Sequence, residues 1–218
     1  MIAFQEVWKE FRLPGGGRKT VLGGMTLSLP RRSRIAVIGR NGAGKSPFLR
    51  LVSGVTQPDR GEITRSGKVS WPMGFSGGVH PALTGRQNAR FIARVYGVDT
   101  DDLVSEVEDF AELGPFFDAP VAAYSSGMRA RLALGISLAA SFDCYLVDEI
   151  TAVGDAAFRK KAHAAITDKL RDTQLFMVSH SEATLREYCT SALLLAGGAA
   201  RYFDRLEDGL AHYRESAA

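Results

Sequence analysis

The segment GRNGAGKS, Gly39 to Ser46, has the residue types and the spacing of a loop that binds phosphate groups. It satisfies the pattern G-x-x-x-x-G-K-[ST] and follows a short apolar stretch, Arg34 to Ile38, that is typical of a buried strand. Glycines let the backbone curl so that its N–H groups point at phosphate oxygens, and the dipole of the next helix adds positive potential. A glycine turn that binds nothing is the alternative, which the flanking strand and helix disfavour. The loop therefore predicts a nucleotide phosphate site.

Each part of this loop has an expected contact. Lys45 is expected to bridge the terminal phosphates of ATP, and Ser46 is expected to offer its hydroxyl to Mg²⁺. The ATP contacts predicted for the segment are Gly39, Arg40, Asn41, Gly42, Ala43, Gly44, Lys45, Ser46 and Pro47.

A second candidate site is CYLVDE, Cys144 to Glu149, where an apolar stretch ends in two carboxylates. The carboxyl ends of strands form the edge at which α/β proteins bind ligands. Asp148 is expected to hold Mg²⁺, and Glu149 to orient and deprotonate the attacking water. Solvated carboxylates at a strand end are the alternative, but the position of this strand after a phosphate loop favours the catalytic interpretation.

The elements that must position these residues follow from the apolar pattern. The first thirty residues predict antiparallel strands around the turn PGGG, and Arg34 to Ile38 predicts a buried strand. Alternating strands and helices in the second half predict an α/β fold with a mostly parallel sheet. Further predicted elements are helices near Arg86 to Tyr96 and Asp101 to Leu113, a helix from Ser126, a helix ending at Leu170, strand 175–180, a helix from Ser181 and a hairpin at Gly197 and Gly198.

Composition limits the classes of function. The chain has 218 residues, of which 45% are hydrophobic, so it can bury the core of one globular domain. The longest apolar candidate, Leu132 to Val147, is interrupted by Asp143 and does not predict a membrane span. The N-terminus lacks the pattern of a signal peptide, so a cytosolic chain is expected, with Cys144 and Cys189 as small core residues. A net charge of +3 with scattered basic residues argues against a dedicated nucleic-acid partner.

The segment YSSGMRARLAL, from Tyr124, resembles the signature motif of ATP-binding cassette (ABC) proteins, usually written LSGGQ. Ser125 and Gly127 match the serine and the second glycine, whereas Tyr124, Ser126 and Met128 depart from the consensus. A small polar turn at a helix N-terminus can bind an anion, although an ordinary helix cap at Ser125 or Ser126 is the alternative. The resemblance implies that Ser125, Ser126 and Gly127 contact an ATP bound to another subunit.

The resemblance covers essentially the whole chain and implies further site residues. Asp155 matches the D-loop aspartate, His180 the switch histidine that contacts the terminal phosphate, and Phe11 the ring placed against adenine. A solvated histidine and a core phenylalanine are the respective alternatives. The implied fold is the ABC nucleotide-binding domain: a P-loop NTPase core with an N-terminal antiparallel β subdomain and an inserted helical subdomain at about 76–140, within one domain spanning 1–218.

Two positions depart from the family pattern. The usual glutamine after the strand near Val69 is absent, since WPMGFSGG offers no amide or carboxylate. Pro47 replaces the usual serine or threonine after Ser46, and it can donate neither an N–H nor a hydroxyl to the α-phosphate. Proline is acceptable in the first helical turn, although it disfavours the α conformation at Ser46. We therefore expect weakened ATP binding with the catalytic residues retained.

Within the family the chain is most similar to the ATPases of capsular and related cell-surface polysaccharide exporters. The stretches that carry this similarity are GRNGAGKS, SWPMGFSGGVHPALTGRQNARFIARVYG, VDEITAVGD and YFDRLEDGLAHYRE, with Gln87 in place of a usual glutamate. The SWP stretch is characteristic of that group, so the missing glutamine is expected to be a lineage trait. Related O-antigen export ATPases carry an additional carbohydrate-binding domain at the C-terminus, and from the length of this sequence none is expected here.

The resemblance also implies a mechanism and partners. Two copies are expected to pair head to tail, with each ATP and its Mg²⁺ between Lys45 of one copy and Ser125 of the other. Residues 75–96 are expected to dock onto a separate polytopic permease, which places the chain peripherally at the cytoplasmic face of the bacterial inner membrane. The alternatives are a soluble ABC ATPase outside transport and a degenerate ATP-binding regulator that hydrolyses little ATP.

Overall fold

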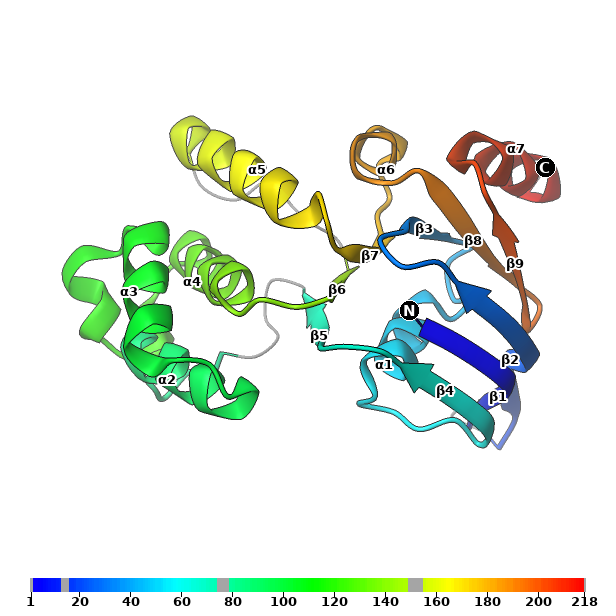
Figure 1. Ribbon diagram of the computed structural model, residues 1–218, viewed down its shortest axis with the longest axis horizontal. Coiled ribbons are helices and arrows are strands. Elements are labelled where there is room, and N and C mark those ends of the chain that lie inside the picture. The colour runs from blue at the N-terminus through cyan, green and yellow to red at the C-terminus, as the bar shows by residue number, and fades with distance from the viewer. Residues whose placement is uncertain (1, 13–15, 74–78, 149–154, 218) are drawn as a thin grey trace. The chain divides into compact units, whose positions relative to one another are not determined.

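The computed structural model describes residues 2–12, 16–73, 79–148 and 155–217 (Figure 1). By its contacts the chain divides into two compact units. The first unit comprises residues Met1–Pro72, Phe142–Glu149 and Asp172–Ala218, and the second comprises Met73–Ser141 and Ile150–Arg171. The expected limits of one domain with a helical subdomain stay a prediction.

A three-stranded antiparallel sheet opens the first unit. It consists of β1 (Ile2–Arg12), β2 (Arg18–Leu29) and β4 (Arg60–Arg65), in the order β2-β1-β4. One side of β1 is buried, including Ile2, Phe4 and Val7, with a bulge between Phe4 and Val7 that shifts the alternation by one residue. The predicted antiparallel pair is confirmed, and β4 is a strand that the sequence did not predict.

The second sheet of this unit is mostly parallel, as predicted. Its six strands run in the order β5-β6-β7-β3-β8-β9, with β6, β7, β3 and β8 parallel and β9 antiparallel to β8. The strands are β3 (Arg34–Ile38), β5 (Val69–Met73), β6 (Cys144–Asp148), β7 (Gln174–Val178), β8 (Ser191–Ala196) and β9 (Ala199–Phe203). Gly197 and Gly198 form the predicted hairpin turn, with φ of 57° and 83°.

Three helices belong to the first unit: α1 (Lys45–Ser53), α6 (Glu182–Tyr188) and α7 (Leu206–Ala217). The helix α1 contacts β6 and β7 and buries Phe48, whose ring centroid lies 5.7 Å from that of Phe4 and 5.9 Å from that of Phe176. This aromatic cluster joins both sheets to α1 in one apolar core. The helix α7 was not predicted.

The second unit is helical in its described part. It contains α2 (Gly85–Tyr96), α3 (Thr100–Ala111), α4 (Ser126–Ala139) and α5 (Ala156–Leu170), with short 3₁₀ turns η1 (Gly114–Asp118) and η2 (Val121–Ala123). The helix α3 packs against α2 and α4. These helices match the predicted ones, except that α3 ends at Ala111, two residues before the predicted end, because Glu112 takes a left-handed conformation.

The two cysteines are core residues, as expected. Cys144 and Cys189 are buried free thiols, and burial raises the pKa of each to about 12. Of the helices in the described ranges, none combines the length and the apolarity that a membrane crossing needs.

Candidate functional site

Three predicted site segments meet at one edge of the six-stranded sheet. The phosphate loop follows β3, Asp148 ends β6, and His180 lies two residues beyond the end of β7. Since β7 lies between β6 and β3 and all three strands are parallel, their carboxyl ends share an edge. The topology therefore brings residues far apart in sequence to the position where α/β proteins bind ligands.

The glycines of the loop are required by its backbone and by close neighbours. Gly39, Gly42 and Gly44 have φ of 154°, 81° and 103°, values that other residues rarely adopt. A Cβ on Gly39 would lie 2.5 Å from the Leu195 carbonyl oxygen, and one on Gly44 would lie 2.5 Å from Val21 Cγ1. The loop can therefore curl under β2 and against the end of β8 only with glycine at these positions.

The loop's lysine and the start of α1 are arranged around an anion-binding backbone. Lys45 Nζ donates to the carbonyl oxygens of Gly39 and Arg40, at 2.8 and 3.3 Å. The first hydrogen bond within the helix runs from Phe48 N–H to Gly44 O at 2.8 Å, so the N–H groups of Lys45 and Ser46 have no acceptor in the helix. These N–H groups and the helix dipole suit a phosphate.

Pro47 is accommodated in α1 without loss of a helical hydrogen bond. It is the third helical residue, a position whose N–H would have no helical acceptor. Ser46 is helical in spite of the proline after it. The predicted survival of the helix is confirmed. The N–H group that Pro47 lacks therefore affects only the contacts that a bound ligand would make.

The carboxylate and the histidine occupy neighbouring strand ends. Asp148 is half-buried and is paired with Val178, the last residue of β7. His180 is exposed, in a turn where the Ser179 hydroxyl accepts from Ser181 N–H at 3.1 Å and Ser181 then caps α6. Arg40 and Asn41 of the loop are also exposed, and Ala43 is half-buried. Glu149, the predicted base, lies outside the described residues.

Ser70 of β5 is bonded to the neighbouring strand β6 at Leu146, two residues before Asp148, and sequence reasoning missed it. Its fully buried hydroxyl accepts from Leu146 N–H at 2.9 Å and donates to the Trp71 carbonyl at 2.8 Å. The Trp71 ring meets Phe142 edge-on, with centroids 5.5 Å apart. The SWP stretch, which attracted attention only for its missing glutamine, thus joins β5 to β6 through Ser70. The sequence held no signal for this role, because the partner of Ser70 comes from a distant strand.

Phe11 lies at the end of β1 and is half-buried against the apolar core. Lys9 Nζ lies 5.5 Å from the centroid of its ring. Both expectations for this ring, a core contact and a surface for a base, fit a side chain that is only partly covered.

The signature segment forms a capped helix start in the second unit. Ser125 is the N-cap of α4, and its hydroxyl accepts from Met128 N–H at 3.2 Å. Ser126 and Gly127 open the helix, and the Arg129 guanidinium donates to the Tyr124 carbonyl at 2.6 Å. Both serines are exposed. The N–H groups of this first turn therefore resemble those of α1 in being suited to an anion.

Asp155 also begins a helix. It is the N-cap of α5, accepting from Phe158 N–H at 2.9 Å, and it forms an ion pair of 2.9 Å with Arg131 of α4. The Phe158 N–H and the Arg131 charge hold the pKa of Asp155 below its usual value. The Arg131 guanidinium stacks 4.3 Å from the Phe158 ring centroid. Arg131, which sequence reasoning missed, therefore joins the predicted D-loop residue to the signature helix.

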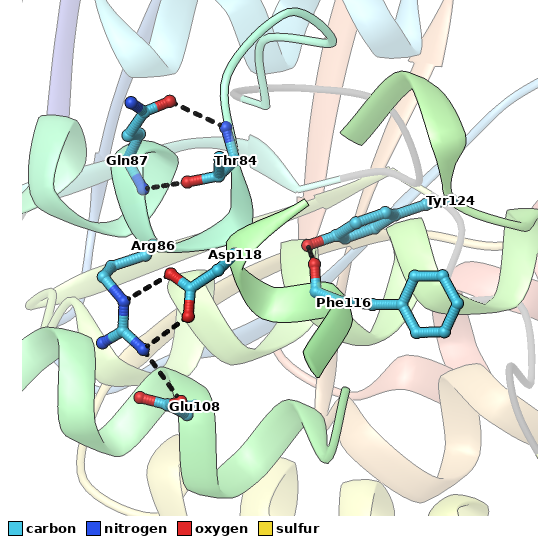
Figure 2. A network of polar contacts seen from close by, with 7 residues as sticks. All are labelled: Thr84, Arg86, Gln87, Glu108, Phe116, Asp118 and Tyr124. Atoms are coloured by element: carbon cyan, nitrogen blue, oxygen red, sulfur yellow. Dashed lines mark hydrogen bonds and ion pairs between the residues drawn. The ribbon is translucent and has the colours of Figure 1, made fainter. Parts of the chain in front are cut away.

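The LTGRQN segment at the start of α2 is explained by the network in Figure 2. Thr84 and Gln87 form a capping box, in which Gln87 N–H donates to the Thr84 hydroxyl at 3.0 Å and Thr84 N–H to the Gln87 side-chain oxygen at 2.9 Å. Buried Asn88 donates to the Thr84 carbonyl and accepts from His80 N–H at 2.7 Å. Gln87 therefore completes the capping box at the position where the family pattern has glutamate.

The same network reaches the signature turn. The Tyr124 hydroxyl donates to the Phe116 carbonyl at 2.6 Å (Figure 2). Gly85 leaves room for this hydroxyl, because a Cβ there would lie 2.7 Å from it. Arg86 forms ion pairs with Asp118 at 2.7 Å and Glu108 at 3.0 Å. The residue just before Ser125 is thus tied, through η1, to the start of α2. Tyrosine in place of the usual leucine supplies this hydroxyl.

Comparisons with known proteins agree with this geometry. The family model described as "ABC transporter" matches residues 22–152. The polysialic acid transport ATP-binding protein KpsT of Escherichia coli is 46% identical over 99% of each chain. The capsule polysaccharide export ATP-binding protein CtrD of Neisseria meningitidis serogroup B is 43% identical over 98% of each, and the ATP-binding protein BexA of Haemophilus influenzae is 42% identical over 99%.

Solved structures agree on the fold. An ATP-binding subunit of an ABC transporter superposes with a TM-score of 0.80 at 20% identity, covering 100% of this chain and 95% of that one. The dimeric ATP-binding cassette MJ0796, bound to ADP and Pi, superposes with a TM-score of 0.76 at 18% identity, covering 94% and 99%. The predicted α/β nucleotide-binding fold is confirmed. The chain belongs to the ABC transporter family, among the ATP-binding proteins that include these full-length capsule export relatives.

Proposed function

We propose that this chain binds and hydrolyses ATP as the motor subunit of an exporter of a capsular or other cell-surface polysaccharide. The observation that carries the proposal is the shared sheet edge, where the phosphate loop, Asp148 and His180 meet. The substrate class is supported by relatives that match over nearly the full length of both chains and whose names specify polysialic acid and capsule polysaccharide.

The proposed residue roles are supported by this arrangement for the loop and by the resemblance to ABC proteins for Phe11, His180 and Glu149. The N–H groups of the loop and of the first turn of α1 bind phosphate oxygens, and Lys45 exchanges its two carbonyl contacts for the terminal phosphates. His180 contacts the terminal phosphate, Phe11 packs against adenine, and Glu149 activates the attacking water.

Mg²⁺ fits the side chains present at this edge. Ser46 lies in the first turn of α1, which contacts β6, the strand that Asp148 ends. The described residues include no group of three His, Cys, Asp or Glu placed for a metal ion. One hydroxyl and one carboxylate agree with Mg²⁺, which usually takes few protein ligands and completes its shell with water and substrate phosphates. When bound, the ion neutralises charge on the transferring phosphoryl group.

The proposed partners rest on the resemblance to ABC proteins. Lys45 belongs to the first unit and Ser125 to the second, and by that resemblance the signature turn serves the ATP of a second copy. In this proposal two copies pair on binding ATP, with Ser126, Gly127 and Asp155 at the pairing surface. A polytopic permease holds the pair peripherally at the cytoplasmic face of the inner membrane. No nucleic acid takes part.

The test is Mg²⁺-dependent ATP turnover of the purified chain beside its Glu149→Gln variant. We expect turnover in the wild type and its loss in Glu149→Gln, with nucleotide binding retained by both. Chelation of Mg²⁺ should abolish wild-type turnover. Turnover that persists in Glu149→Gln would contradict the assigned base.

A second candidate is a regulator that binds ATP without hydrolysing it, which Pro47 favours because it removes a phosphate donor. Pro47→Thr separates the two functions. If the wild type shows no ATP turnover and the Pro47→Thr variant does, the chain is a regulator. If both proteins reach the same maximal turnover at saturating ATP, the chain is a motor.

A further inference from the structure

The Lys19 side chain lies over the phosphate loop of the first unit. A Cβ built on Gly42 would lie 3.1 Å from Lys19 Nζ, and one built on Gly44 would lie 2.5 Å from Val21 Cγ1. Lys19 and Val21 are two apart on β2, so they point to the same side of the strand. Alternate side chains of β2 thus cover alternate glycines of the loop: the apolar one covers the buried Gly44, and the ammonium covers the exposed Gly42.

The position and charge of Lys19 suit an anionic ligand. Its side chain is exposed, whereas the adjacent Arg18 pairs with Glu10 at 3.3 Å. Throughout the described part of the chain, no carboxylate lies within ion-pair distance of the Lys19 ammonium. A cation at the rim of a loop whose N–H groups face inward increases the attraction of that loop for an anion.

The strand pairing indicates which part of a nucleotide Lys19 faces. Phe11 and Lys19 are direct partners in the antiparallel β1–β2 ladder, so their side chains stand on the same face. With adenine against Phe11 and the terminal phosphates in the loop, Lys19 lies between the base and those phosphates. The α-phosphate occupies that part of a nucleotide.

We propose that Lys19 binds the α-phosphate of ATP and compensates in part for the hydrogen bonds that Pro47 cannot donate. This inference rests on the proposed ATP-binding function. Lysine suits the role because its point charge on a flexible chain reaches a phosphate oxygen without a fixed geometry. The contacts that Pro47 cannot make and the contact that Lys19 makes then concern the same phosphate.

The test is calorimetric titration of wild type and variants with ADP and with a non-hydrolysable ATP analogue. Lys19→Met should weaken both ligands by the same factor, about three- to tenfold, because the α-phosphate is common to both. Lys19→Arg keeps the charge and should stay within about twofold of the wild type. The difference between wild type and Lys19→Met should shrink as salt is raised, since an exposed charge contact is screened.

Arg18→Met is the matched control, because it removes a neighbouring exposed charge from the other side of β2. It should leave affinity unchanged, and the melting temperatures of all variants should agree. In a Pro47→Thr background the penalty of Lys19→Met should become smaller, since both groups then serve one phosphate.

Five other results would contradict the proposal or the function on which it rests. Unchanged affinity in Lys19→Met, or an equal loss in Arg18→Met, would overturn the proposal. A loss confined to the ATP analogue would overturn the α-phosphate assignment, and a penalty independent of Pro47 would overturn the compensation. A wild type that binds neither nucleotide would contradict the proposed function itself.

Discussion

At Pro47, local backbone geometry separates an effect on folding from an effect on ligand binding. The helix α1 begins at Lys45, and its first internal hydrogen bond is made by Phe48 N–H, one residue after the proline. The proline therefore removes no bond that the folded chain makes to itself. Its cost should appear only when a phosphate occupies the loop.

Pro47→Thr should raise ATP affinity about ten- to a hundredfold, because the variant restores an N–H and a hydroxyl that can donate to phosphate. Calorimetry with a non-hydrolysable analogue measures it. Pro47→Ala, which restores the N–H alone, should give an intermediate affinity. Equal affinities in all three proteins would show that this position makes no phosphate contact.

The role of a residue could be predicted from sequence where a motif specifies it. It could not be predicted where the role depends on a contact that forms only in the folded chain. The types and spacing of Gly39, Lys45 and Asp148 were sufficient to predict a phosphate site. Ser70 and Lys19 were missed, because their partners, Leu146 and Gly42, come from other elements. Glu149 stays a prediction.

At the scale of elements, the start of α2 and the turn before α4 are built as one network. The bridge between Thr84 and Pro120 and the bond from Val121 N–H to Leu83 O at 2.9 Å join the two segments. The Tyr124 hydroxyl adds a bond to the Phe116 carbonyl of η1. Gly85 lies at the centre of this junction. The LTGRQN segment therefore sets the position of the signature turn within the second unit.

Gly85→Ala should destabilise the chain by about 1 to 3 kcal/mol, because the added Cβ would lie 2.7 Å from the Tyr124 hydroxyl and 2.8 Å from the Phe117 ring. Urea unfolding measures the loss. Arg90→Ala, on an exposed position of the same helix, should change stability by less than about 0.5 kcal/mol. Stability unchanged in Gly85→Ala would show that the junction is not tightly packed.

Two elements escaped sequence prediction for identifiable reasons. The strand β4 buries only Ile63, so its sequence lacks the alternation that a strand with one covered face shows. The helix α7 contains Gly209, a poor helix former, yet a Cβ there would lie 2.5 Å from Ala192 Cβ of β8. Close approach to the sheet requires glycine, so a packing demand overrides local propensity.

At the scale of the whole molecule, ATP binding should determine the oligomeric state. The loop and the signature turn belong to different compact units of the chain. In the proposed dimer, each ATP is held by the loop of one copy and the Ser125 turn of the other. A nucleotide that binds only the paired state shifts the population toward that state.

Glu149→Gln with Mg²⁺-ATP should therefore give particles of twice the 23.6 kDa chain mass, because ATP persists at the interface. Light scattering after size exclusion measures this mass. Adding Ser125→Arg should restore monomers that still bind ATP in their own phosphate loop, with a lower apparent affinity because the contacts from the other copy are lost. A Glu149→Gln protein that stays monomeric at saturating ATP would contradict the head-to-tail dimer.

The strand order has a consequence for synthesis of the chain. The strand β3, which leads into the phosphate loop, is made early, but its sheet neighbours are β7 and β8, near the end of the sequence. Until β7 and β8 leave the ribosome, β3 has unpaired edges and α1 has no completed sheet to cover. A chain that ends before β6 and β7 lacks Asp148 and the strand that pairs with β3, so we expect nucleotide to stabilise it little and its products to be substrates for proteases.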